Sequence, residues 1–107
     1  MTKKAQGVSP TFRVVAEYWL TKDTADEVLG HLAQLATASR NEPANLGYGY
    51  FRNVENPLHV TILETYTDEA GFDAHKTSLH FQSIGKTKIL PLLADRVVRT
   101  YTHGIQG

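Results

Sequence analysis

The side chains best suited to acid–base chemistry lie close together between residues 64 and 81. Glu64 and Tyr66 are two residues apart and share one face of a predicted strand with the apolar Val60 and Ile62. A carboxylate on an apolar face is costly to bury unless it is paired or protonated, and perturbed carboxylates gather at functional sites. Glu64 is therefore a candidate acid–base group or substrate anchor. The alternative is a structural glutamate near a strand end, paired with an arginine.

Two histidines follow in the same stretch, His75 and His80, five residues apart. Histidine titrates near neutrality, so either ring could accept or donate a proton. We interpret His75 as the functional one and His80 as a helix-end histidine bonded to a backbone carbonyl. Two metal ligands on one helix usually occupy positions i and i+4, and the sequence contains no cysteine. We therefore expect no metal site.

Three further side chains each have a structural interpretation beside a functional one. Trp19 could line a pocket, but a large aromatic side chain in a strand is more often part of a core or an interface. Tyr50, close to Tyr48 in a predicted hairpin, could donate a hydroxyl into a cavity or pack at a dimer seam. Arg40 ends a predicted helix, where a cation suits the helix dipole, and anion binding is the alternative role.

Alternating and helical hydrophobic patterns divide the chain into strands and helices. Thr24-Ala-Asp-Glu27 matches a capping box at the start of the first helix. Glu55-Asn56-Pro57 is typical of the turn in a hairpin, and Thr77-Ser78 marks a break in the second helical region. The patterns predict strands over 11–20, 45–54, 58–67 and 94–103, and helices over 25–40, from 67 to the break, and from 79 to about 90.

The order of these elements, β-α-β-β-α-β, is that of a ferredoxin-like α+β fold. We expect a four-stranded antiparallel sheet with helices on one face. The other face also carries apolar side chains, and the chain offers no further element to cover it. We therefore expect a homodimer packed through the sheet faces. Residues 1–10 are polar and predict a disordered arm before a single domain formed by residues 11–107.

Composition argues against several classes of protein. The length of 107 residues corresponds to one domain. Eleven basic and eleven acidic residues cancel, which argues against a nucleic-acid partner and against a polybasic membrane-surface module. No stretch reaches the ~18 apolar residues of a membrane span, and no signal peptide is evident. We therefore expect a cytoplasmic protein. The glycine motifs of nucleotide-binding loops and nucleophile elbows are absent, so the sequence indicates no cofactor.

A diffuse set of residues between positions 40 and 81 carries a family resemblance. The set comprises Arg40-Asn-Glu42-Pro43, Asn45-Leu46-x-Tyr48, Asn56-Pro57, Glu64-x-Tyr66-x-Asp68, Phe72-x-Ala-His75 and His80-Phe81. In this set the chain resembles the antibiotic biosynthesis monooxygenase family. The family's usual Glu-Pro-Gly reads Glu42-Pro43-Ala44 here, a departure that should alter only the turn. The resemblance implies a dimeric α+β barrel with a pocket between sheet and helices in each subunit.

The resemblance also implies a choice of activities on a small aromatic or oxygenated metabolite. Family members include cofactor-independent oxygenases of quinols and polyketide phenols. They also include an isomerase of a phosphorylated autoinducer, whose Tyr-x-Asp-Glu…His-Lys-Thr-Thr run is similar to Tyr66-Thr-Asp-Glu69 and His75-Lys-Thr-Ser78. Haem-degrading relatives use a first-strand Asn and a Trp at the end of the third strand. The first strand here has no Asn and the third ends in Tyr66, so we expect no haem degradation.

As an oxygenase, the protein would use His75 to remove a phenolic proton, and the resulting anion would react with dioxygen. Glu64 would orient the ring or share the proton, and Tyr66 and Tyr50 would donate to the developing oxyanion. The expected pocket walls and substrate contacts are Trp19, Arg40, Tyr50, Phe51, Phe72, His80 and Phe81.

Two alternatives stay open on the same fold. As an isomerase, the protein would move a proton beside a carbonyl, with Arg40 or Lys76 binding a phosphate. It could also be a non-catalytic ligand-binding protein, because a fold does not fix a function.

Overall fold

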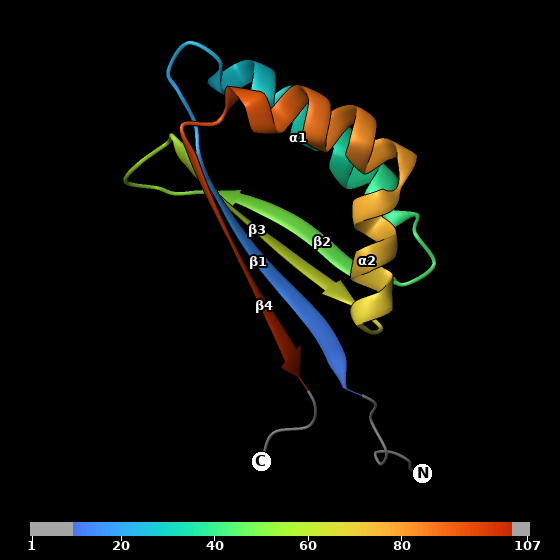
Figure 1. Cartoon of the computed structure of the whole chain (residues 1–107). Coiled ribbons are helices and arrows are strands. Elements are labelled where there is room, and N and C mark those ends of the chain that lie inside the picture. Colours follow the sequence, from blue (N-terminus) through green and yellow to red (C-terminus); the bar gives the residue numbers. More distant parts are fainter. Residues whose placement is uncertain (1–9, 104–107) are drawn as a thin grey trace.

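The computed structural model describes residues 10–103 and consists of one antiparallel sheet with its helices on a single face (Figure 1). The element order β-α-β-β-α-β confirms the predicted ferredoxin-like α+β fold. The predicted arm lies outside the described residues except for Pro10. The strands are β1 (Thr11–Trp19), β2 (Asn45–Arg52), β3 (His59–Tyr66) and β4 (Asp95–His103), in the sheet order β2-β3-β1-β4. The helical elements are α1 (Ala25–Arg40), α2 (Glu69–Thr77), η1 (Phe81–Ile89) and η2 (Leu90–Leu92).

The alternation of side chains along β3 determines what faces the helices. Val60, Ile62, Glu64 and Tyr66 share that face and are all buried. Strand β1 pairs antiparallel with β3, so its partner residues lie on the same face. These buried partners are Tyr18, Ala16, Val14 and Phe12. Glu64 is therefore a carboxyl group set into an otherwise apolar sheet surface, as its position in the sequence predicts.

Helix α1 covers this surface over the predicted range. Its buried stripe contributes Val28, Leu32, Leu35 and Ala36 to the core. Burying each of the two leucines contributes roughly 2 kcal/mol, so packing holds this helix on the sheet. No helix within residues 10–103 is long and apolar enough to cross a membrane.

The predicted capping box at the start of α1 is wrong. Thr24 is the N-cap residue, but its side chain makes no capping hydrogen bond. Its hydroxyl instead lies 2.7 Å from the hydroxyl of Thr21 and 3.5 Å from the carbonyl of Leu92. One local contact and one tertiary contact thus engage the hydroxyl that the sequence pattern assigned to helix capping.

A break after α2 confirms the one predicted near Ser78. The Ser78 hydroxyl accepts a hydrogen bond from the Phe81 backbone N–H at 3.1 Å, which starts a second helical segment. That segment, η1, is a π-helix, and the backbone N–H of Leu90 donates to the Gly85 carbonyl five residues back. A Cβ at Gly85 would lie 3.0 Å from the Phe81 ring. The sequence pattern predicts a helix here but not its π geometry.

Gly71 has a packing role in α2. A Cβ at this position would lie 2.6 Å from the Cβ of Ala44, in the loop before β2. The Asp68 carboxylate accepts a hydrogen bond from the Gly71 N–H at 2.8 Å and caps the helix. The glycine thus lets α2 approach the loop that follows α1 closely.

The other face of the sheet carries no helix within the described residues (Figure 1). Phe51 and Leu63 lie on it and are 56% and 47% exposed. Val97 and Tyr101 on β4 are exposed as well. Trp19 also faces this side and stacks on His59, with ring centroids 4.8 Å apart. We call this surface the open face.

Candidate active site

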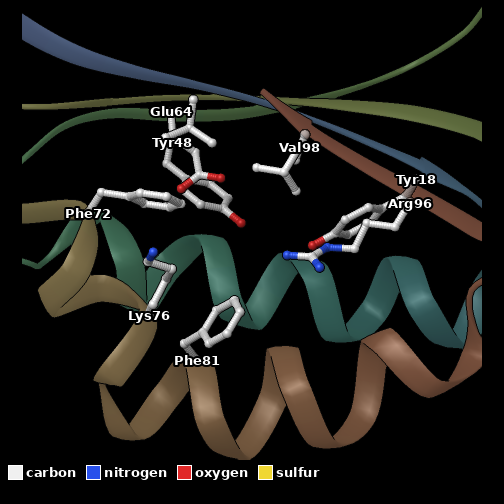
Figure 2. A pocket seen from close by; sticks show the side chains of 10 residues that line it. Tyr18, Tyr48, Glu64, Phe72, Lys76, Phe81, Arg96 and Val98 are labelled. Atoms are coloured by element: carbon white, nitrogen blue, oxygen red, sulfur yellow. The ribbon is translucent and has the colours of Figure 1, made fainter. Parts of the chain in front are cut away.

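A pocket lies between the sheet and the helices, with Glu64 in its wall (Figure 2). The space between its walls is about 330 Å³ when the part that opens to solvent is counted. Figure 2 shows the Glu64 carboxyl and the Tyr48 hydroxyl pointing from the sheet toward Phe72, Lys76 and Phe81 on the helical side. The complete lining is Val14, Ala16, Tyr18, Tyr48, Glu64, Phe72, Lys76, Phe81, Arg96 and Val98.

Glu64 is the acid–base group that faces the pocket. Only 6% of it is exposed, and the Tyr66 hydroxyl donates to its Oε1 at 2.6 Å. The pKa of Glu64 is raised to about 7, chiefly by burial and also by the nearby Glu42, while the Tyr66 hydrogen bond and Arg96 oppose this rise. A carboxyl with a pKa near neutrality can both take and return a proton under physiological conditions.

His75 lies behind Glu64 and does not line the pocket. It is 1% exposed, its Nδ1 lies 2.7 Å from Oε2 of Glu42, and its Nε2 lies 3.8 Å from Oε1 of Glu64. Burial lowers the pKa of His75, although the hydrogen bond with Glu42 opposes the shift. We expected His75 to face the substrate and Glu64 to orient it. In the structure Glu64 lines the pocket instead, and His75 lies behind Glu64.

Glu42 is a site residue that sequence reasoning missed. It lies in the loop after α1, and its Oε2 contacts both His75 Nδ1 at 2.7 Å and His80 Nε2 at 2.5 Å. Its other oxygen, Oε1, is buried without a hydrogen-bond partner within residues 10–103. The only signal in the sequence is an acidic residue before Pro43 in the family-like loop. Nothing in that spacing indicates two histidines more than thirty residues away.

Glu42, His75 and His80 are also residue types that bind metals, with donor atoms within 4.8 Å of one another. The five-residue spacing of the histidines did not predict this convergence, because the i, i+4 rule applies to two ligands on one continuous helix. The break at Ser78 instead places the two rings on different segments. Two ligands of a tetrahedral zinc ion at ~2.1 Å would stand roughly 3.4 Å apart. The distances of 2.5 and 2.7 Å to one oxygen are those of hydrogen bonds.

Two cations border the pocket. Arg96 on β4 is paired in register with Tyr18, hydrogen-bonds its hydroxyl and lowers the pKa of Glu64. Burial raises the pKa of Tyr18 to about 12, so this hydroxyl is a donor near neutrality. Lys76 lies with its Nζ 4.6 Å from the Phe72 ring centroid. Sequence reasoning missed Tyr18 and Arg96, although strand alternation places both on the helix-facing side.

The remaining expected site residues divide between the pocket and other places. Phe72 and Phe81 line the pocket as expected. Trp19 and Phe51 do not, because each points to the open face of the sheet, so their assignment as pocket walls is corrected. The others lie near the site without lining it: Tyr50 packs in the core, Arg40 donates from Nε to the Tyr48 carbonyl at 2.9 Å, His80 contacts Glu42, and Tyr66 holds Glu64.

The chain is thus a ferredoxin-like α+β domain whose sheet sets a buried carboxyl into the wall of an aromatic pocket. Residues 11–87 match the model of the antibiotic biosynthesis monooxygenase family, and the chain belongs to this family. The resemblance noted in the sequence is therefore confirmed.

Solved structures share the fold along almost the whole chain. A conserved protein from Methanosarcina mazei is 26% identical with a TM-score of 0.83, and the match covers 90% of this chain and 95% of that one. A structure named antibiotic biosynthesis monooxygenase is 26% identical with a TM-score of 0.79, over 84% and 95% of the two chains. A Shewanella oneidensis protein, 23% identical with a TM-score of 0.82 over 90% and 93%, shares the fold. No curated protein sequence gives a match.

Proposed function

We propose that this protein is a cofactor-independent monooxygenase that oxidises a quinol or another aromatic phenol with dioxygen. The observation that carries the proposal is Glu64, a buried carboxyl with a pKa of about 7 at the wall of an aromatic pocket. Family membership and a similar structure named as a monooxygenase support the same reaction class. The substrate loses two hydrogens and gains one oxygen atom, and the second oxygen atom leaves as water.

Each part of the pocket has a task in this reaction. Glu64 removes the phenolic proton, because it is the titratable carboxyl that faces the substrate. The charges of Arg96 and Lys76 lie where they stabilise the phenolate that forms. Phe72 and Phe81 hold the aromatic ring and keep water from the electron-rich anion.

Oxygen uptake with a panel of quinols, naphthols and anthrones tests the proposed function. The expected result is substrate-dependent oxygen consumption that persists after exhaustive dialysis against a metal chelator. Consumption that stops after dialysis and returns with added metal would overturn the cofactor-independent mechanism. A complete lack of uptake and of melting-temperature shift across the panel would overturn the aromatic substrate class.

The two cations favour an isomerase as the second candidate. Arg96 and Lys76 could bind an anionic or phosphorylated substrate while Glu64 moves a proton beside its carbonyl group. Such a reaction needs no oxidant, so it would proceed equally fast without oxygen. Anaerobic turnover of sugar phosphates or hydroxyketones therefore distinguishes the isomerase from the oxygenase.

The protein is further proposed to be a homodimer that packs through the open face. Exposed apolar side chains on β2, β3 and β4, among them Phe51 and Leu63, support this assembly. Exposed apolar surface on a sheet face is typical of an interface, and the absence of net charge does not oppose association.

Leu63→Lys is expected to dissociate this dimer, because it sets a charge into the centre of the apolar surface. Light scattering at micromolar concentration should give the mass of two chains for the wild type and of one chain for the variant. The matched control is Leu79→Lys, since Leu79 is exposed on the helical side. A monomeric wild type, or equal dissociation by the control, would contradict the interface.

A further inference from the structure

We propose that His75, Glu42 and His80 form a proton path that connects Glu64 with solvent. The inference rests on the proposed function, since a base that takes a proton in every turnover must also release it. It assigns Glu42 and His80 as positioning and proton-carrying residues that need not touch the substrate.

The four groups form a series with one longer step and two steps of hydrogen-bond length. Glu64 Oε1 lies 3.8 Å from His75 Nε2, and His75 Nδ1 lies 2.7 Å from Glu42 Oε2. The same Glu42 oxygen lies 2.5 Å from His80 Nε2. The first step exceeds a hydrogen bond, so a rotation of the Glu64 carboxyl toward His75 closes it.

Exposure increases from His75 through Glu42 to His80, whose side chains are 2%, 12% and 24% exposed. Glu64 is 6% exposed. Direct exchange of the Glu64 proton with bulk water is therefore hindered once a substrate fills the pocket, and His80 is the group in the series that water reaches best. The buried groups lie between the pocket and this exit, as a proton path requires.

The local fold holds the middle of the path in place. The Glu42 backbone N–H donates to the Ser39 carbonyl at 3.1 Å, and its carbonyl accepts from the Asn45 N–H at 3.1 Å. The Ser78 hydroxyl donates to the His75 carbonyl at 2.7 Å, and the turn it forms brings His80 back toward Glu42. Because Oε1 of Glu42 has no partner within residues 10–103, both contacts pass through one oxygen, Oε2.

The transfers balance without any co-reactant. A proton passes from the Glu64 carboxyl to Nε2 of His75, and Nδ1 of His75 releases one to Oε2 of Glu42. Glu42 passes a proton to Nε2 of His80, and Nδ1 of His80 releases one to water. One proton enters and one leaves, and the reverse sequence returns a proton to the site. The series needs both histidines with the proton on Nδ1 and Nε2 free, that of His75 toward Glu64 and that of His80 toward Glu42.

The test uses Glu42→Gln and His80→Gln, which keep a hydrogen-bonding side chain but carry no proton near neutrality. Each is expected to lower kcat about 100-fold at unchanged KM. Imidazole added as a diffusible proton carrier should restore most of the rate. The matched control is Glu27→Gln with His31→Gln, an exposed pair 3.4 Å apart on α1, which should change neither parameter.

An unchanged rate, or a loss that imidazole does not restore, would overturn the proton path. If the wild type turns over no substrate, the proposed function fails. NMR of isotope-labelled histidine side chains then tests the proton path independently of activity, because it reports the tautomer of His75. The expected spectrum below neutrality shows neutral His75 protonated at Nδ1 and unprotonated at Nε2. A neutral His75 protonated at Nε2 would overturn the path whatever the activity.

Discussion

Replacing Glu64 with Gln is expected to lower kcat/KM by about 10²–10⁴-fold, the usual contribution of a general base. The amide keeps the size of the side chain and still accepts the Tyr66 hydrogen bond seen at 2.6 Å, but it cannot take a proton. Oxygen uptake with a quinol that the wild type oxidises measures the effect. Glu55→Gln, in the exposed turn between β2 and β3, is the matched control and should retain full activity.

The pH dependence of the same reaction is an independent test of Glu64 as the general base. Wild-type kcat/KM should rise with pH through about 7, since Glu64 acts as a base only when it is deprotonated. Burial is the main cause of this raised pKa, and among the charged neighbours Glu42 raises it and Arg96 lowers it. A Glu64→Gln variant with wild-type activity and the same pH profile would remove Glu64 from the mechanism.

The same substitution is expected to stabilise the folded protein above neutrality by up to about 3 kcal/mol. The ordinary glutamate pKa of 4.5 is raised to about 7 in the fold, and one pKa unit corresponds to ~1.4 kcal/mol. Because the folded pKa is the higher one, the stability that Glu64 contributes is complete below about pH 4.5 and decreases as pH rises to about 7. Gln carries no charge and escapes this loss.

Denaturant unfolding of wild type and Glu64→Gln at a fixed chain concentration measures this difference in the free energy of unfolding. The two curves should nearly coincide in acid and separate between about pH 4.5 and 7. A constant difference across this range would mean that the buried carboxylate is fully compensated by its neighbours. A gain in stability together with a loss of activity is the expected pattern for a group kept for function.

Much of the site could be predicted from local sequence pattern. Strand periodicity places Glu64 and Tyr66 among apolar residues, and this is where the structure has them. The bounds of α1 and the break at Ser78 follow from the hydrophobic stripe and from residues that favour helix ends. Each of these inferences depends on neighbours within one element, which a single sequence describes well.

The relations between elements could not be predicted in the same way. Glu42 meets His75 and His80 only because the loop after α1 packs against two segments separated by a break. Arg96 reaches the pocket because β4 pairs with β1 in one particular register. Phe51 was assigned to the pocket because it is aromatic. Strand alternation places it on the face of the sheet opposite to that of Tyr48 and Tyr50.

NMR titration of the Glu64 side-chain carboxyl carbon tests the central claim most directly. The signal is assigned by its loss in Glu64→Gln, and the protein is titrated without any substrate. The account predicts a pKa of about 7, in agreement with a desolvated carboxyl poised as a base. A pKa near the ordinary value of 4.5 would show that Glu64 is a plain structural carboxylate and would contradict the proposed mechanism.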